Sequence, residues 1–315
     1  LILRMRDLAL LLRQRRKNRG ALELQMPEAR LEYDDQGRVV GAHFARHDLS
    51  HQIIEEFMLA ANEAVAEHLA GLGVAFLRRI HPAPEPAKLK EFATFARSLG
   101  YRIDSALDRF ALQKILEQSA GKPDVYAVHY ALLRSLKQAI YAPHEEGHYA
   151  LASDCYCHFT SPIRRYPDLV VHRLLEQYLQ RGKVGSDPTE LLALGDHCSK
   201  MERRAEMAER DLVRLRLLTY LSERIGLTLE VVITGVADYG FFGQAENLPV
   251  EGLVHISTLT DDYYSLDEET HTLIGRKTHK RYRLGDKVVV TVVRVDLNRR
   301  QLDFRVKSRR KEREK

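Results

Sequence analysis

One stretch of the chain carries most of its chemical information: Phe159-Thr160-Ser161-Pro162-Ile163-Arg164-Arg165-Tyr166-Pro167-Asp168. Its two prolines restrict the backbone, and a helix is expected to begin just after Pro167. The side chains of Arg164 and Arg165 leave this loop on opposite sides. Because guanidinium groups bind phosphate oxygens in pairs, rigid arginines beside a helix N-terminus indicate phosphate recognition. The alternative is an ion pair between one arginine and a nearby acid such as Asp168.

The rest of the composition is that of an ordinary globular protein. The 315 residues are 44% hydrophobic and 30% charged, which argues against a disordered or fibrous chain. No apolar run approaches the roughly 18 to 20 residues of a membrane span, and no secretory signal pattern is seen. Three cysteines are too few for a disulfide framework, so we expect a protein of the reducing cytoplasm. The chain begins at Leu1 within a helical pattern, and we expect it to be part of something longer.

The net charge of +5 averages two regions of opposite sign. Residues 225–275 contain nine acidic residues and neither Lys nor Arg. Residues 276–315 contain sixteen basic and five acidic residues, a local balance of 16 − 5 = +11. Basic segments of this kind favour a nucleic-acid partner, although a solvated tail is the alternative for residues 307–315.

Periodicity and turn signals divide the chain into a helical part and a β-rich part. A hairpin is predicted between residues 21 and 44, and helices are predicted at 1–17, 50–69, 87–99, 105–118, 127–140, 168–180 and 195–224. From residue 227 to 306, β-branched and aromatic residues are dense and turns recur. We therefore predict an α+β protein with domains at 1–225 and 226–307 and a basic tail at 308–315.

The 50–69 helix, with Ser50 as its predicted cap, carries a polar pair at the edge of an apolar face. At about 100° per residue, Glu55 and Asn62 fall at the border of that face, where polar groups can line a cleft. A cap or a salt bridge is the alternative explanation. The predicted core face is Ile54, Phe57, Met58, Ala61, Val65 and Leu69, and the predicted solvent face is Glu56, Glu63 and Glu67.

The 195–224 helix shows the same arrangement. Glu206 has Arg210 four residues later and is satisfied locally. Glu209 lies at the border of the apolar face without a helical partner, so it is a second candidate for a cleft. The predicted core face consists of Cys198, Met201, Ala205, Ala208, Leu212 and Leu215.

A zinc-like motif occurs at His144-Glu145-Glu146-Gly147-His148. Zinc chemistry with this motif needs both histidines on one helix face, yet Pro143 precedes it and Gly147 lies inside it. No third ligand stands out at a sensible spacing, and Cys155-x-Cys157 lacks a second pair. We therefore predict no metal site in this region.

Taken together, several segments resemble the RNB family of exoribonucleases, over essentially the whole chain. The Ser-Pro-Ile-Arg-Arg-Tyr block is the most specific, and the matching segments are residues 51–62, 147–152, 158–172 and 207–211. The later residues are similar to an S1 domain, a five-stranded OB barrel, at 235–236, 239–242, 251–257 and 284–286. The resemblance implies an α+β fold: the mostly helical C-terminal part of an RNB catalytic domain, followed by an all-β OB-fold (S1) barrel.

The resemblance also implies an activity, the stepwise hydrolysis of RNA from its 3′ end to nucleoside 5′-monophosphates. In the matching segments, Arg164 corresponds to the arginine that holds the scissile phosphate, and Glu209 to an active-site glutamate on a neighbouring helix. Glu55 corresponds to the glutamate that contacts the terminal sugars, where a 2′-hydroxyl would distinguish RNA from DNA. Further RNA contacts are expected from Asn62, Arg165 and Tyr166.

On the S1-like part, Tyr239, Phe242 and His255 are expected to stack on bases without sequence preference. A position in the barrel core is the alternative for Phe242.

Two departures from the family pattern matter. Family members hydrolyse RNA with Mg²⁺ held by an aspartate cluster, which lies upstream of every residue present here. Asp34-Asp35 in a hairpin turn and Asp261-Asp262 in a barrel loop are no substitute. Leu24 stands where some members have an aromatic residue that clamps a base. We therefore expect part of a monomeric enzyme that acts on single-stranded RNA away from membranes; the alternative is an RNA-binding module without catalysis.

Overall fold

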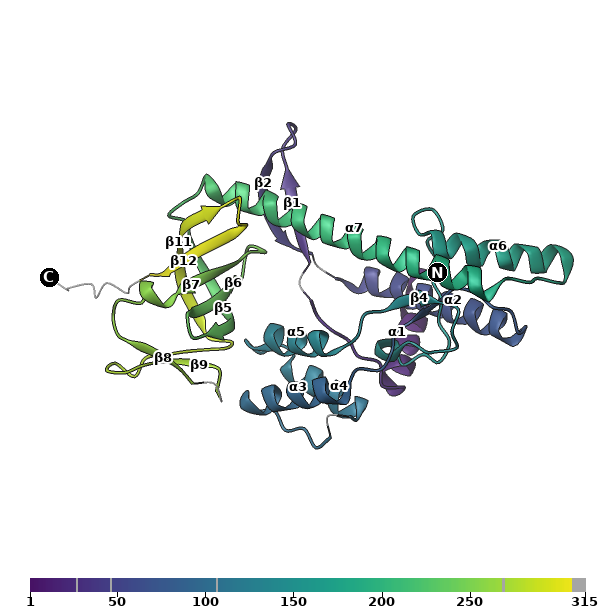
Figure 1. Ribbon diagram of the computed structural model, residues 1–315, viewed down its shortest axis with the longest axis horizontal. Helices are drawn as coiled ribbons and strands as arrows, with labels where there is room; N and C mark the ends of the chain where they lie inside the picture. The colour runs from purple at the N-terminus through teal and green to yellow at the C-terminus, as the bar shows by residue number, and fades with distance from the viewer. Residues whose placement is uncertain (27, 46, 106, 268–269, 308–315) are drawn as a thin grey trace.

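The computed structural model describes residues 1–26, 28–45, 47–105, 107–267 and 270–307, so the predicted tail at 308–315 lies outside the described residues. A helical part and a β barrel are joined by one long helix, α7 (Figure 1). No helix in the described ranges is long and apolar enough to cross a membrane. The elements before the barrel are α1 (Ile2–Asn18), β1 (Ala29–Tyr33), β2 (Val39–Phe44), α2 (Leu49–Gly71), β3 (Arg78–Ile80), α3 (Pro86–Ser98), α4 (Arg109–Ser119), α5 (Val125–Ser135), β4 (Ile140–Ala142), η1 (Tyr149–Leu151), α6 (Tyr166–Arg181) and α7 (Pro188–Ser222).

Helices α3, α4 and α5 pack around one apolar core. In Figure 1 these three helices lie below α7. The helix predicted at 127–140 is shorter than expected. It ends at Ser135, and Ile140 instead begins β4, which pairs antiparallel with β3. The core residues include Leu89, Phe92, Leu112, Ile115 and Leu132.

The buried face of α2 is rotated from the predicted one. Ile54 is 53% exposed, whereas Glu56 is only 2% exposed. The cause is α1, whose Arg16 places Nη2 2.6 Å from Glu56 Oε1. Glu63, also predicted to face solvent, pairs at 2.7 Å with Arg19, the residue that follows α1. The prediction was wrong because periodicity counts apolar residues and does not detect an acidic helix face that a basic helix covers.

The start of α2 also differs from the prediction. Asp48, not Ser50, is the cap, and its carboxylate accepts hydrogen bonds from the backbone N–H groups of Ser50 and His51. A capping carboxylate satisfies N–H groups that have no partner within the helix, so it fixes where α2 begins.

Helix α7 does not bury the face that its sequence predicts. Met201 and Leu212 are 41% and 55% exposed, and Ala205, Ala208 and Leu215 are exposed with them. Near its start, α7 lies directly on the backbone of β4, because a Cβ on Gly195 would be 2.4 Å from the Tyr141 carbonyl oxygen. Near its end, Leu217, Leu218 and Leu221 join the barrel core. The hairpin strands β1 and β2 also contact α7, and its exposed residues lie on sides that no described element covers.

The barrel has five strands in the closed order β11-β12-β7-β6-β5, the architecture of an OB fold. Strand β12 pairs parallel with β7, and the other neighbouring pairs are antiparallel. Residues such as Ile233, Phe241 and Phe304 fill the interior. The strands are β5 (Thr228–Ala237), β6 (Gly240–Ala245), β7 (Glu251–His255), β11 (Lys287–Asp296) and β12 (Gln301–Val306), with β8 (Tyr264–Asp267), β9 (Thr272–Gly275) and β10 (Arg281–Arg283) in a separate side sheet.

Two of the contacts between the barrel and the helical part are made by turns of the barrel. Arg300, in the turn between β11 and β12, forms an ion pair with Asp211 of α7. The turn at Gly285 lies against the residue before α5, where an added Cβ would be 3.1 Å from Asp124 Cβ. Gly285 also has a φ of +83°, which favours glycine.

The buried Arg16–Glu56 pair gives a stability prediction. Replacing Glu56 by Gln removes the nearer of two counter-charges of a guanidinium that remains buried, and Glu23 stays 3.0 Å from Arg16, so the free energy of unfolding should fall by about 2 kcal/mol. Urea unfolding measures this change. The control Glu206→Gln breaks an exposed pair with Arg210 and should cost less than about 1 kcal/mol. Equal effects of the two variants would contradict the assignment.

Candidate nucleic-acid interface

We call residues 157–165 the arginine loop, and it is held against α2 by one buried amide. Asn62 donates from Nδ2 to the Tyr156 hydroxyl at 2.9 Å, and its Oδ1 accepts from the Phe159 backbone N–H at 2.9 Å. Asn62 is only 3% exposed, so both contacts are shielded from water. Its amide therefore sets the distance between α2 and the arginine loop.

A second anchor comes from α6. Asp168 is completely buried, and its Oδ1 accepts from the Ser161 N–H at 2.8 Å and from Arg165 Nη2 at 2.7 Å. The ion pair that the sequence left open therefore forms with Arg165. Arg164 is exposed, and its side chain has no ion pair or hydrogen bond within the described ranges. The two neighbouring arginines thus differ: one holds the loop, and one is free for a ligand.

A cleft of about 500 Å³ lies between α2 and the arginine loop. It brings together three predicted site residues, Glu55, Asn62 and Arg165. Its apolar wall includes Ile54, which explains why this residue is exposed although it is hydrophobic. The complete lining is His47, Ser50, His51, Ile54, Glu55, Met58, Leu59, Asn62, Tyr156, Thr160 and Arg165.

Two polar atoms on this lining lack partners. Thr160 Oγ1 and Arg165 Nε are buried and have no hydrogen bond within the part of the chain that the structure describes, and the same holds for Asp168 Oδ2 behind them. Buried polar groups are nearly always satisfied in native proteins, so such atoms need an explanation. Capacity to bind a ligand is one explanation, and it fits their position in the cleft wall.

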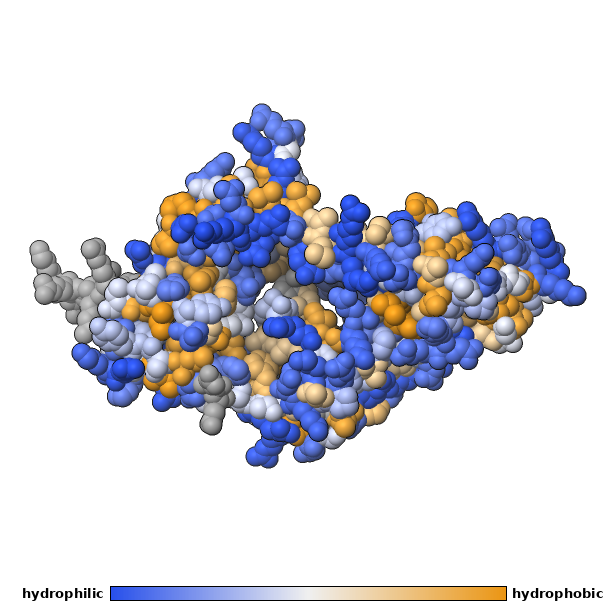
Figure 2. Space-filling model, viewed as in Figure 1, coloured by the Kyte–Doolittle hydropathy of each residue, from blue (hydrophilic) through white to orange (hydrophobic). Residues whose placement is uncertain are grey.

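The cleft continues into a larger cavity of about 840 Å³, which shares His47 and Glu55 with it. This cavity is also lined by Leu24 and by Tyr126 at the start of α5. Figure 2 shows that the molecular surface is hollowed between α7 and α5. Glu55 therefore lines both the cleft at the arginine loop and the cavity that reaches Tyr126.

Three predicted site residues lie outside the cleft lining. Arg164 and Tyr166 project into solvent beside it, and Tyr166 is 49% exposed at the first turn of α6. Glu209 lies in the exposed middle of α7, and its side chain forms no ion pair within the described residues. The structure thus groups Glu55, Asn62 and Arg165 and leaves Glu209 on a separate element.

The predicted aromatic residues of the barrel share one outer surface. Phe241, not Phe242, points into the core, because it is completely buried while Phe242 is half-buried. The rings of Tyr239 and Phe242 meet edge to face with centroids 6.3 Å apart. His255 is exposed on the adjacent strand, opposite Gly240. We refer to Tyr239, Phe242 and His255 as the barrel face.

Two histidines, His148 beside the arginine loop and His158 within it, are half-buried. The Tyr141 hydroxyl and His158 Nδ1 are 2.8 Å apart, and the rings of His148 and Tyr156 are 5.4 Å apart. Burial, together with the charges of His81 and Arg79, lowers the pKa of His148 to about 3. Burial and the charge of Arg165 lower the pKa of His158 as well. Both rings are therefore neutral at physiological pH.

The zinc-like motif, which includes His148, is not a helix. His144 is exposed in a bend and His148 is half-buried in a bridge, so the two rings do not share a helix face. Among the described residues, no group of three His, Cys, Asp or Glu side chains could hold a metal ion. These residues therefore do not fit the Mg²⁺ that the resemblance implies.

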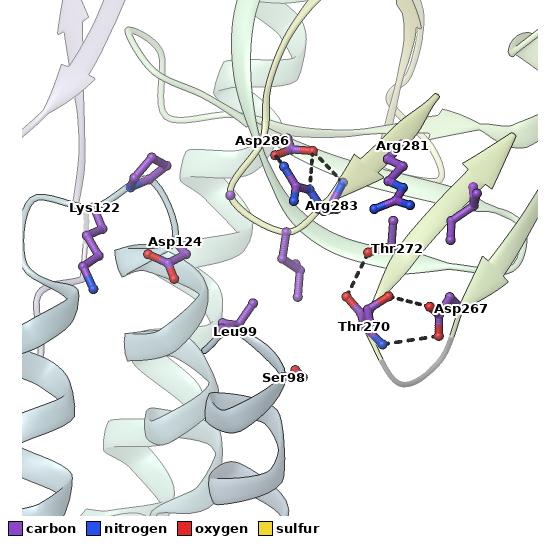
Figure 3. A pocket seen from close by; sticks show the side chains of 14 residues that line it. Ser98, Leu99, Lys122, Asp124, Asp267, Thr270, Thr272, Arg281, Arg283 and Asp286 are labelled. Carbon is purple, nitrogen blue, oxygen red and sulfur yellow. Dashed lines mark hydrogen bonds and ion pairs between the residues drawn. The ribbon is translucent and has the colours of Figure 1, made fainter. Parts of the chain in front are cut away.

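A cleft of about 510 Å³ between the helical part and the side sheet is a weaker candidate for RNA (Figure 3). Its cations are matched by equal numbers of carboxylates, so it offers no net attraction for phosphates. Arg283 is also paired with Asp286 at 3.4 Å. The charged lining residues are Lys122, Arg281, Arg283, Asp124, Asp267 and Asp286.

Comparisons with known proteins agree with this organisation. The family model described as RNB domain matches residues 1–181, and that of the S1 RNA binding domain matches residues 223–307. Ribonuclease R of Aquifex aeolicus is 39% identical over 95% of this chain and 43% of its own length. Ribonuclease R of Thermotoga maritima is 40% identical over the same shares. Mycoplasma genitalium RNase R in complex with ribose methylated single-stranded RNA matches with a TM-score of 0.85 and 28% identity, over 96% of this chain and 49% of that one.

The chain therefore belongs to the RNB family, and an S1 domain follows its RNB residues. The relatives that it resembles in both parts are bacterial ribonucleases R. The chain spans about 43% of the length of these curated relatives, so the activity of a whole relative does not follow from similarity alone.

Several cleft residues were missed at the level of sequence. Tyr156 and Thr160 line the cleft, yet each lies in an irregular segment without periodicity. His47 precedes α2 and is likewise outside any helical pattern. The only sequence signal for these three residues was that they lie near the proline-containing loop or near the cap of α2. Such proximity does not show where a side chain points.

The half-buried histidines predict acid sensitivity. Because the pKa of folded His148 lies near 3 while an unfolded histidine titrates near 6.5, the unfolded state binds the proton first. Stability is therefore complete above about pH 6.5 and is lost as pH falls toward 3, by up to about 1.4 kcal/mol per pH unit for this residue.

Urea unfolding at pH 7.5 and 5.0 tests this prediction. His148→Gln should reduce the difference between the two pH values, whereas the exposed control His144→Gln should leave it unchanged. An unaltered difference in the His148 variant would show that this ring does not carry the effect.

Proposed function

We propose that this chain forms the RNA-holding part of a 3′-to-5′ hydrolytic exoribonuclease of the ribonuclease R type, which releases nucleoside 5′-monophosphates. The observation that carries the proposal is the cleft in which Glu55, Asn62 and Arg165 meet beneath an arginine loop fixed by buried anchors. A fixed loop presents its free guanidinium at low entropic cost, and preorganised charge is what a phosphoryl transition state requires.

Each predicted residue has a role that fits its position. Arg164 has no side-chain partner among the described residues, so it can place its guanidinium on the scissile phosphate. Glu55 lies in the cleft and can accept hydrogen bonds from the 2′- and 3′-hydroxyls of the terminal ribose. Glu209 is assigned an active-site role by correspondence of its segment alone. Asn62 and Arg165 act mainly by fixing the arginine loop, and Tyr166 lies beside it.

The barrel face is assigned to the upstream part of the RNA. Its exposed aromatic surfaces can stack on bases of any sequence. Because the S1 domain and the cleft share one chain, a single RNA strand could contact both. We further propose that the protein is a cytoplasmic monomer.

The second candidate is an RNA-binding module without catalysis. It is favoured by one observation, that no described group of acidic or histidine residues could hold a metal ion. The Mg²⁺ expected for exoribonucleases of this family would have to be bound by side chains other than those described.

One experiment separates these two functions. The chain is incubated with labelled single-stranded RNA and Mg²⁺, and binding and product release are measured together. We expect saturable binding and no release of mononucleotides unless the upstream part of the enzyme is supplied. Steady release of mononucleotides by this chain alone would contradict that expectation, and absence of binding would overturn the proposed function.

Arg164→Ala in the complete enzyme tests the role of the free arginine. Because Arg164 is assigned to charge that develops during hydrolysis, kcat should fall about 100-fold or more, with a much smaller change in RNA affinity. Arg181→Ala, on the exposed end of α6, is the matched control and should change neither quantity. An equal loss of turnover and affinity would assign Arg164 to simple binding.

A further inference from the structure

One face of α5 carries an aromatic and cationic row that the proposed function does not use. Tyr126, Tyr130 and Arg134 follow at intervals of four residues, so they lie one above another on the helix. The two tyrosine rings are nearly parallel, with an interplanar angle of 6° and centroids 5.9 Å apart. The Arg134 guanidinium carbon is 5.9 Å from the Tyr130 ring centroid. We call these three residues the tyrosine ladder.

Two members of the tyrosine ladder, Tyr130 and Arg134, are not part of the α5 packing surface, whereas Tyr126 is half-buried. The helix buries its opposite side, which includes Val128 and Leu132 of the helical core. Tyr130 is 42% exposed, and Arg134 is exposed as well. Neither tyrosine hydroxyl has a hydrogen-bond partner within the described residues. Packing therefore does not account for the exposed ring of Tyr130, which lies parallel to that of Tyr126.

Tyr126 is the member of the tyrosine ladder that lies nearest to Glu55 and its cleft. This residue lines the cavity of about 840 Å³ that also contains Glu55 and Gln25. The cavity joins the cleft beneath the arginine loop through Glu55 and His47. An RNA strand whose 3′ end reaches Glu55 would therefore pass the Tyr126 ring, which lines the same cavity.

The other end of the path leads to the S1 domain. Helix α5 contacts β5 of the barrel, and burial together with the charge of Glu251, the first residue of β7, raises the pKa of Tyr126 to about 12. Strand pairing opposes Glu251 with Gln244 and, two residues on, Leu253 with Phe242. Alternate residues of a strand share one side, so Glu251 lies on the same outer surface as Phe242 and His255. Figure 1 shows the start of α5 next to β5 of the barrel.

We propose that the tyrosine ladder is a base-stacking surface for single-stranded RNA that extends from the Glu55 cleft to the barrel face. Exposed rings bind bases through their π faces whatever the sequence, and an arginine at the end of the row adds attraction for bases and phosphates. The proposal rests on the function proposed above, because it concerns the same strand. It adds a contact that neither the arginine loop nor the S1 domain supplies.

RNA length separates this contact from those in the cleft. Wild-type chain and a Tyr130→Leu variant are titrated with single-stranded RNAs of about 4 and about 16 nucleotides, by fluorescence anisotropy. Leucine keeps an apolar side chain but removes the π face. We expect Tyr130→Leu to weaken binding of the long RNA about tenfold and to leave the short RNA unchanged. Tyr33→Leu, on the exposed hairpin strand β1, is the control and should change neither.

A spectroscopic readout tests stacking directly, because the chain contains no tryptophan. Tyr130→Trp introduces a single indole that keeps a π face, so long RNA should still bind and should quench its emission. The same substitution at Tyr33 should give emission that RNA does not change.

The outcomes distinguish the two proposals. Loss of long-RNA affinity in Tyr130→Leu with quenching in Tyr130→Trp supports the tyrosine ladder. Wild-type binding to both RNAs with no effect of Tyr130→Leu overturns the tyrosine ladder and leaves the proposed function standing. Failure of the wild-type chain to bind either RNA overturns the proposed function and, with it, this inference.

Discussion

The geometry of the interface depends on how one irregular loop is held in place. Asn62 bonds the loop to α2 through two hydrogen bonds, and Asp168 bonds it to α6 through a buried carboxylate. Removing a partner from a buried polar group costs its full desolvation penalty, so these contacts constrain the loop strongly. The two neighbouring arginines therefore have different roles. Arg165 is held by its ion pair with Asp168, whereas the side chain of Arg164 is exposed to solvent.

The same constraint explains the unusual polarity of α2. A helix that lines a cleft cannot bury its whole apolar face, so Ile54 faces the cleft instead of the core. The opposite side must then pack, and it does so through ions, with Glu56 against Arg16 of α1. A buried ion pair is weak support for stability but sensitive to loss of one partner. The orientation of α2 and the presence of the cleft therefore follow from the same packing of α2 against α1.

Sequence patterns located the helices better than their buried faces. Most helices appeared near their predicted ranges, because periodicity, proline at the first turn and glycine at the end act locally. The predicted faces of α2 and α7 were wrong at most positions, although Leu69 is buried and Glu67 exposed as predicted, because a face is buried only if another element covers it. Gly195 shows this: its missing side chain admits the β4 backbone, which no apolar count would identify. Among the site residues, Glu55 and Asn62 were found by helical position, whereas Tyr156 and Thr160 lie in segments without a period.

The sequence by itself determined the order of the parts, the family and the identity of the chemically active groups, since these depend on residue types and short-range spacing. Only the tertiary structure decided which arginine is free, because Asp168 could have paired with either neighbour. It also decided that Glu55 opens into a cavity shared with Tyr126, two residues far apart in the chain. Contacts between distant segments depend on packing geometry, and packing geometry is a property of the folded chain as a whole.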